Sequence, residues 1–487
     1  MERLSGLDAA FLYLETPTLL MHTLKLVLLD RPECPVDVRA GLIEATRSRL
    51  HLLPSLRRRL LKVPLGLHHP IWIESSAVDL ERHVLRTQIR APGGQREMDD
   101  AVAEIASSPL ARSRPLWELW VLEGRSDGGL AVLLKIHHAL ADGTAAAHLI
   151  AAVTSTDRFE PPLPKPDEKP SLERIPSKSS LLRGAVVDHL RDARRLPSLT
   201  LRTARSVMSL VRKPLDPRPP LPMLDVPRTS FNGALSARRS FATASLSLAR
   251  ACFVKATANV TLNDVILELV GAALRSYLKG RGELPARSLI ASVPISSELK
   301  VSHRLASNRV SSLFTTLATD LADPWERLLA IHAVTSQAKH AQDVLGLGLL
   351  GTWLQYTMPR PFSWVVSQWS GRHLANLVPP PANVVVSNVH GPAHQLFAAG
   401  LPLRAMYSAG PVLEGIGLNV TVWSYLERLN FTVLACRDMI PDPHIITRLL
   451  EAALDELDER AQWVSGQATS ALPEPSPRPS GGSTQLS

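Results

Sequence analysis

Two proline-rich stretches near the middle of the chain set the strongest limit on its fold. The first is PPLPKPDEKP, at residues 161–170, and the second is PLDPRPPLP, at residues 214–222. Proline has no backbone N–H and a fixed φ, so neither a helix nor a strand is expected to continue through such a run. The chain has 487 residues, which is too long for one compact core. We therefore expect two domains joined by a linker.

The linker covers residues 158–228 and separates a first half, residues 1–157, from a second half, residues 229–465. It contains two basic helical patterns, SLLRGAVVDHLRDARRL before Pro197 and LTLRTARSVMSLVRK after it. Residues 466–487 read GQATSALPEPSPRPSGGSTQLS. This composition is typical of a disordered tail, so we exclude it from the expected fold.

Both halves mix strand-like runs with helical patterns, and the expected class is α+β. In the first half, residues 24–30 and 130–136 are expected strands, and residues 37–52 and 98–106 are expected helices. In the second half, LNDVILELVGAALRSYL predicts a helix capped by Thr261 or Asn263. Strands are expected at SLIASVPISS, NVVVSNV, LNVTVWSY and LNFTVLAC, and a last helix at residues 445–463.

Charge and composition narrow the classes of partner. The formal net charge is +9 and the isoelectric point is near 9.7, which favours an anionic partner such as nucleic acid, a membrane surface or a phosphorylated cofactor. Aromatic residues make up 5%, without a zinc-knuckle or RNP-type motif, so we expect no nucleic acid. The cysteines, Cys34, Cys252 and Cys436, are far apart and form no CxxC pair. They indicate a reducing compartment and no metal site.

The location is expected to be cytoplasmic, since we find neither a secretory signal nor an apolar run of about 18 residues. Peripheral attachment to the inner face of the plasma membrane or to lipid droplets is the alternative. It rests on the arginines of the linker, which alternate with apolar side chains. A charge run is usually a solvated helix face, but here the arginines could meet anionic headgroups while the apolar residues dip below them. The residues concerned are Arg183, Arg191, Arg194, Arg195, Arg202 and Arg205, with Leu182, Val186, Leu190 and Leu201.

The segment GLAVLLKIHHALADG, at residues 129–143, places polar groups at the end of an apolar strand. His137 and His138 come first, followed by Asp142 and Gly143. A histidine held at a strand end suits a general base near neutral pH, because its ordinary pKa lies close to 7. Asp142 could orient the imidazole directly, or indirectly by pinning the turn that Gly143 permits. Chance occurrence of this spacing is rare, which favours a catalytic interpretation over a structural histidine.

HHALADG resembles the HHxxxDG motif of the bacterial wax ester synthase/acyl-CoA:diacylglycerol acyltransferase family. Further stretches extend the resemblance over nearly the whole chain apart from the linker and the tail. They are LSGLDAAFLYLETPTLLMHT, RPLWELWVLEG, LNDVILELVGAALRSYL, VPISS with SNRVSSLFTTL, and NVVVSNVHGP. HHxxxDG alone indicates only the broader superfamily of CoA-dependent acyltransferases. The whole series of stretches resembles this one family within it. One departure is His390, where the family usually has proline.

The resemblance implies two chloramphenicol-acetyltransferase-like halves with a tunnel at their interface. It makes His138 the general base that takes the proton from an acceptor hydroxyl, which then attacks the thioester of an acyl-CoA co-substrate. The acceptor would be diacylglycerol or a fatty alcohol, and no cofactor or metal would be bound. We find no G-x-S-x-G motif, which agrees with a route without an acyl-enzyme. Asp142 would support the loop, and His137 would be an auxiliary that strand alternation points the other way.

Four more residues are candidates for the substrate tunnel. The resemblance makes Asn263 and Asp264 organisers of the second half near the tunnel, although a plain helix cap explains them equally well. Ser387 and Asn388 end an apolar strand and could donate hydrogen bonds to the oxyanion, or form a turn. The PLW residues, at 115–117, are expected to pack in the core.

Two other functions remain open. A condensation or polyketide-associated acyltransferase also carries HHxxxDG but takes its acyl group from a carrier protein. A lipid-surface binding protein with a vestigial site is the alternative that involves no catalysis. The intact His138, Asp142 and Gly143 weigh against the second, and the N-terminal and Asn-Asp segments weigh against the first.

Overall fold

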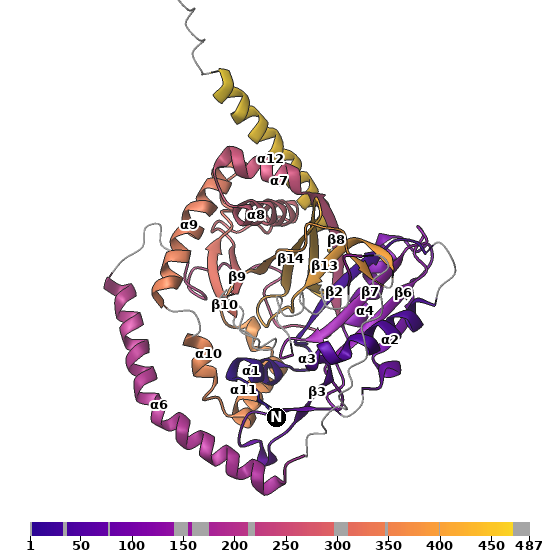
Figure 1. The fold of residues 1–487 in the computed structure, drawn as a ribbon. Coiled ribbons are helices and arrows are strands. Elements are labelled where there is room, and N and C mark those ends of the chain that lie inside the picture. The colour runs from indigo at the N-terminus through magenta and orange to yellow at the C-terminus, as the bar shows by residue number, and fades with distance from the viewer. Residues whose placement is uncertain are drawn as a thin grey trace, which may run out of the picture.

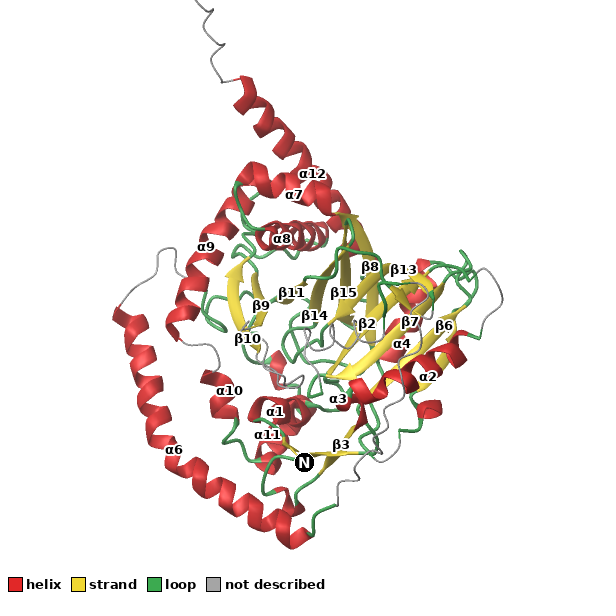
Figure 2. Cartoon of the chain, in the orientation of Figure 1, coloured by secondary structure: helices red, strands yellow, loops and turns green. Residues whose placement is uncertain are grey.

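The computed structural model describes residues 2–32, 37–75, 78–140, 154–157, 175–212, 220–296, 310–345, 349–398 and 400–470. The fold is built on two six-stranded sheets, one in each of two lobes (Figures 1 and 2). A third, three-stranded sheet has the order β1-β4-β3, with β1 at Glu2–Arg3, β4 at Ile71–Glu74 and β3 at Arg58–Leu61. The mixed architecture confirms the expected α+β class.

The first large sheet has the order β12-β13-β2-β7-β6-β5. Its central strands are β2 (His22–Leu29), β7 (Leu130–His137) and β6 (Trp117–Glu123), and β7 runs antiparallel to both neighbours. The edges are β5 (Val84–Gln88) and the pair β12 (Phe397–Ala398) and β13 (Leu401–Ala409). The strands expected at residues 24–30 and 130–136 are both confirmed.

The second large sheet has the order β10-β9-β11-β14-β15-β8. It consists of β8 (Arg239–Ser247), β9 (Ile290–Ser296), β10 (Val310–Thr316), β11 (Val384–Val389), β14 (Leu418–Tyr425) and β15 (Arg428–Cys436). Each strand expected from the second half of the sequence is present. The apolar side chains of β11, β14 and β15 form one buried core with the helices that cover the sheet.

The second half of the sequence contributes strands to the sheet of the first half. β13 belongs to the second half but pairs antiparallel with β2 of the first, with Met406 opposite Val27 and Ser408 opposite Lys25. The Lys25 ammonium donates to the Ser408 hydroxyl at 2.5 Å and lies 5.0 Å from the ring centroid of Trp423 on β14. The first sheet is therefore complete only when the second half has folded beside it.

The helices of the first lobe are α1 (Gly6–Leu14), α2 (Val38–Arg49), α3 (Pro54–Arg57) and α4 (Gln95–Ala106). Short 3-10 turns lie at η1 (Leu50–Leu52), η2 (Pro64–Gly66) and η3 (Leu80–Arg82). Asp37 caps α2 by accepting from the Ala40 N–H, so this helix begins where the sequence predicts. The apolar residues of α1 and α2 join one core with alternate residues of β7, whereas those of α4 join another.

The second lobe carries α7 (Leu248–Ala258), α8 (Leu262–Gly280), α9 (Pro324–Leu345) and α12 (His444–Ser470). The helices α10 (Leu349–Leu354) and α11 (Pro359–Gly371) lie against α1 of the first lobe (Figure 1), and η4 (Leu374–Asn376) follows α11. Residues 466–470 continue α12, so the expected start of the tail at residue 466 is wrong, because the helix extends past the point where its sequence turns polar.

Among the residues described, no single helix is long and apolar enough to cross a membrane. The pair α7 and α8, bent by 107° at its break, passes the same test of length and composition only when the two are joined. Most of α8 is buried, including Val265, Ile266, Leu269 and Val270, in the core that α8 shares with its sheet.

One helix spans most of the described linker. This helix, α6 (Lys178–Arg212), lies along the outside of the molecule (Figure 1). Pro197 lies inside this helix, so the two helical patterns that the sequence separates at Pro197 form one element. Arg3 pairs with Asp188 at 2.9 Å and His189 bonds the Leu67 carbonyl at 2.7 Å, so α6 is attached to the first lobe.

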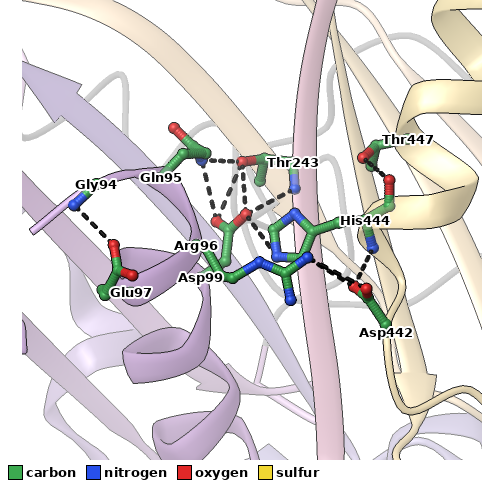
Figure 3. Close-up of polar contacts among 9 residues, drawn as sticks. All are labelled: Gly94, Gln95, Arg96, Glu97, Asp99, Thr243, Asp442, His444 and Thr447. Atoms are coloured by element: carbon green, nitrogen blue, oxygen red, sulfur yellow. Dashed lines mark hydrogen bonds and ion pairs between the residues drawn. The ribbon is translucent and has the colours of Figure 1, made fainter.

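Polar contacts also clamp the lobes together where α4 meets β8 and α12 (Figure 3). Asp99, fully buried on α4, accepts from the backbone N–H of Thr243 at 3.1 Å and from its hydroxyl at 3.1 Å. Gln95 donates to the same carboxyl group at 3.1 Å. Arg96 adds an ion pair with Asp442 at 3.1 Å. Because Thr243 is buried beside Asp99, its N–H and hydroxyl depend on this carboxyl group for a hydrogen-bond acceptor.

We predict that Asp99→Ala lowers the free energy of unfolding by about 2–4 kcal/mol, because it leaves the buried N–H and hydroxyl of Thr243 without their acceptor. Asp100→Ala, which changes the exposed neighbour on the same helix, is the matched control and should cost less than about 0.5 kcal/mol. Urea denaturation of both variants measures the difference. Equal losses in the two variants would show that the contacts of Asp99 add nothing to the free energy of unfolding.

Candidate active site

The two histidines of the motif are held by the backbone of the first sheet. His137 ends β7 opposite His22 of β2, and its N–H donates to the Leu116 carbonyl at 3.0 Å. The N–H of His138 donates to the Met21 carbonyl at 2.8 Å, which extends the pairing by one residue. Successive side chains of a strand point to opposite faces. The sheet therefore separates the two imidazoles.

His138 is half-buried, and its ring stacks on Phe11 of α1. The ring centroids are 4.2 Å apart, with an interplanar angle of 30°. An aromatic ring on one face and partial exposure leave the imidazole oriented but reachable, as a general base requires.

His137 is fully buried and sits among fixed partners. Its Nδ1 accepts from the Ala139 N–H at 3.0 Å, so in the neutral ring the proton lies on Nε2. Nε2 is 3.7 Å from the Glu15 carboxylate, which also pairs with Arg112 at 2.5 Å. Burial raises the pKa of Glu15, but the contacts and charges of His137 and Arg112 outweigh it and lower this pKa to about 2. His137 thus pins the turn that presents His138.

A layer of buried polar groups lies on the α4 side of the same strands. The Lys135 ammonium donates to the Ile105 carbonyl at 3.0 Å and to the Ser108 carbonyl at 2.5 Å, and His22 bonds the Ala106 carbonyl at 2.9 Å. These bonds fasten the end of α4 to the strand that carries the motif. Burial lowers the pKa of Lys135 to about 8 against the opposing charge of Glu118.

Asp142 and Gly143 lie outside the residues that the structure describes. Their expected roles, in supporting and turning the loop, stay predictions.

Asp264 is a fully buried helix cap that also joins two helices. Thr261, not Asn263, is the N-cap of α8, and Asp264 completes a capping box by accepting from the Thr261 N–H at 3.0 Å. His332 and Thr335 of α9 donate to the same carboxylate at 2.8 and 2.7 Å. Burial raises the pKa of Asp264, but hydrogen bonds from Thr335, His332 and Thr261 lower it overall. Asn263 is half-buried beside it.

Ser387 and Asn388 are half-buried near the end of β11. They pair in parallel with Thr421 and Val422 of β14. They therefore belong to the second sheet, whereas His137 and His138 belong to the first. The expected turn role is not seen, since both residues lie within the strand; the PLW residues Leu116 and Trp117 are buried as expected.

Sequence reasoning missed three residues of this site: Phe11, Glu15 and Arg112. The available signal was the segment LSGLDAAFLYLETPTLLMHT, which contains the first two. Gly6 in the same segment lets α1 pack against the end of α10, because a Cβ there would lie 2.2 Å from the Gln355 backbone nitrogen. This close packing sets the position of α1 and hence of Phe11.

A family model described as the wax ester synthase/diacylglycerol acyltransferase catalytic domain matches residues 4–266, and the WS/DGAT C-terminal domain matches residues 306–458. The chain belongs to the wax ester synthase/diacylglycerol acyltransferase family. It is therefore an acyltransferase, as expected from the motif series.

Individual proteins agree with this assignment. A protein of Mycobacterium tuberculosis (strain CDC 1551 / Oshkosh), provisionally named a diacylglycerol O-acyltransferase, is 38% identical over 478 residues, covering 96% of this chain and 98% of its own. A second protein of that strain with the same provisional name is 34% identical over 470 residues, covering 94% of this chain and 91% of its own.

The wax ester synthase/diacylglycerol acyltransferase from Marinobacter aquaeolei VT8 has a similar solved structure. The two structures superpose with a TM-score of 0.66 at 27% sequence identity. The match covers 94% of this chain and 100% of the Marinobacter chain. The first condensation domain of the calcium-dependent antibiotic synthetase shares the two-lobed fold, with a TM-score of 0.56 at 15% identity and coverage of 94% and 96%. This confirms the expected two-half architecture.

We predict that Glu15→Gln removes an acid-sensitive part of the stability. Because folding lowers the pKa of Glu15 to about 2, its charge stabilises the protein above the unfolded-state pKa near 4.5, and this contribution disappears as the pH falls from about 5 to 2. The wild type should exceed the variant by up to about 3 kcal/mol at pH 7, with the gap closing in acid.

Denaturation from neutral to acidic pH measures this gap. Glu44→Gln, which removes the carboxylate of an exposed pair with Arg47, is the control and should show no such pH-dependent gap. A constant difference between wild type and Glu15→Gln at every pH would contradict the electrostatic explanation.

Proposed function

We propose that this enzyme transfers a long-chain acyl group from acyl-CoA to the hydroxyl of diacylglycerol or of a fatty alcohol. The observation that carries the proposal is the placement of His138, anchored through Met21, stacked on Phe11 and partly exposed, in a chain that matches the family in both halves. Acyl-CoA is a co-substrate, and the proposal requires no bound cofactor.

In the proposed reaction His138 acts as general base. One ring nitrogen of the neutral His138 imidazole takes the proton from the acceptor hydroxyl, whose oxygen attacks the thioester carbonyl carbon. The new C–O bond forms, the C–S bond breaks, and the proton passes from His138 to the departing CoA sulfur. The two substrates react in one complex, so no protein nucleophile is needed.

The remaining site residues have supporting roles in this proposal. His137 holds the turn through Ala139, and Asp142 supports the same loop with Gly143 at its bend. Ser387 and Asn388 donate hydrogen bonds to the developing oxyanion from the second sheet, which lines the other wall of a tunnel between the lobes. Asp264 and Asn263 set the position of α8 in that wall.

His138→Ala should lower kcat by about 100- to 10,000-fold, the usual contribution of a general base. Labelled palmitoyl-CoA with diacylglycerol or hexadecanol, followed by thin-layer chromatography, measures the neutral lipid formed. His390→Ala, at an exposed histidine, is the control and should keep wild-type activity. Full activity of His138→Ala would remove the base assignment, and transfer only from an acyl carrier protein would favour a condensation-type enzyme.

We also propose that the outer face of α6 binds an anionic lipid surface, where such substrates partition. Its apolar side chains are unusually exposed: Val186 is 55% exposed, Leu190 61% and Leu201 52%. The arginines Arg183, Arg191 and Arg194 are exposed on the same helix. Arginine beside exposed aliphatic side chains is the composition of interfacial helices. Leu182 is half-buried, so it does not share this exposure.

The double variant Val186→Ser with Leu190→Ser should reduce flotation with phosphatidylcholine vesicles that contain phosphatidylglycerol, because the apolar contacts are lost. Leu377→Ser, at a leucine that is 78% exposed outside α6, is the matched control. Vesicles without phosphatidylglycerol should bind the wild type more weakly. If both variants float as the wild type does, α6 is not the lipid-binding element.

A further inference from the structure

An apolar cleft lies between α2 and the first sheet. Its floor is formed by side chains of β2, β7 and β6, and α2 forms its roof. The lining residues are Lys25, Val27, Leu29, Leu42, Ala45, Thr46, Leu56, Trp117, Leu119, Val132, Leu134, Thr154 and Ala398. Figure 2 shows α2 lying across this face of the sheet.

The cleft is narrow and almost entirely hydrocarbon. Its volume is about 70 Å³, which is room for roughly five water-sized spheres at about 10–15 Å³ each. Apolar cavities give water few hydrogen-bonding partners and take up apolar ligands instead. A linear alkyl chain has the matching chemistry.

Two polar groups on the lining, the Lys25 ammonium and the Trp117 indole, bond to other parts of the protein. The Lys25 ammonium donates to Ser408 at 2.5 Å and lies over the Trp423 ring. The Trp117 indole donates to the Leu56 carbonyl at 2.9 Å and stacks on His83. These bonds satisfy the indole and the ammonium with partners inside the protein, and they hold both side chains in place along the cleft.

The cleft shares a sheet face with His138. On β7 the side chains of Val132, Leu134, Ile136 and His138 follow each other at two-residue intervals, so all four lie on one face. Val132 and Leu134 line the cleft. Ile136, paired across the strands with Trp117, is the one residue on this face between the cleft and His138. Ile136 is fully buried, so a ligand that runs from His138 along β7 enters the cleft by displacing this side chain.

We propose that this cleft is the subsite for the distal part of the donor acyl chain. The proposal rests on the proposed function, because it takes His138 as the place where the thioester reacts. The acyl chain is the better occupant than an acceptor chain, since every reaction of the proposed function includes the acyl group whereas the acceptor varies.

The register also sets a chain length. From His138 to Leu134 the strand advances about 13 Å, at about 3.3 Å per residue. An extended chain advances about 1.2 Å per bond, since three backbone bonds span at most about 3.6 Å. An acyl group therefore needs about ten bonds to reach the cleft. Palmitoyl chains fill it, whereas butyryl and octanoyl chains end before it.

Ala45→Phe tests the assignment by filling the cleft from α2. It should lower kcat/KM for palmitoyl-CoA by about tenfold or more, because the excluded methylenes lose their apolar contacts. Butyryl-CoA and octanoyl-CoA should change less than about twofold. Ala40→Phe, at an exposed position of the same helix, is the matched control. Leu119→Ala opens the cleft and should shift preference toward chains longer than palmitoyl, a direction that general damage to the fold does not give.

Binding of cis-parinaric acid, a fluorescent fatty acid, provides a readout without turnover. We expect saturable binding to the wild type and to Ala40→Phe, and weaker binding to Ala45→Phe. If the wild type transfers no acyl group but Ala45→Phe still binds cis-parinaric acid more weakly than the wild type, the proposed reaction fails and the chain subsite stands. If the wild type is active and Ala45→Phe keeps the length profile of Ala40→Phe, the subsite is overturned. It is equally overturned if the length dependence follows the alcohol acceptor.

Discussion

The pairing of β7 between β2 and β6 is the constraint on which the site depends. These backbone bonds run to the last residue of the strand and one residue beyond it, where His138 donates to the Met21 carbonyl. Because the strand is locked on both sides, its two-residue alternation cannot slip, and a slip by one residue would exchange the positions of His137 and His138. One histidine is committed to holding the turn while its neighbour faces α1.

A second constraint is that the lobes share structure. β13 comes from the second half of the sequence and completes the first sheet beside β2, and Asp99 reaches from α4 to Thr243 on β8. The lobes therefore cannot separate without breaking a strand pair and a buried polar cluster. A fixed relation between them is what the proposed reaction needs, since its proposed base lies in one lobe and its proposed oxyanion donors lie in the other.

The strand that carries the motif has two unlike faces. The face toward α4 holds a buried polar layer, in which Lys135 and His22 bond the end of that helix and His137 faces Glu15. Burying such groups is costly unless they find partners, and here each is supplied by backbone carbonyls or by a carboxylate. The opposite face carries only apolar side chains from Ile136 to Val132. One side of the strand therefore makes the buried polar contacts, and the other side presents the apolar surface.

The sequence by itself determined many of the elements and the pair of histidines, because these follow from local periodicity, capping residues and a motif within seven residues. The family follows from the series of matching stretches along the chain. The sequence placed strands at both sheets and the helix α8, whose cap at Thr261 is a local interaction. Tertiary structure alone decided which strands share a sheet, that Pro197 lies within one long helix, and that Phe11, Glu15 and Arg112 surround the histidines. These contacts join residues separated by tens to hundreds of positions, and no local pattern encodes such distances. Only packing of the completed chain fixes them.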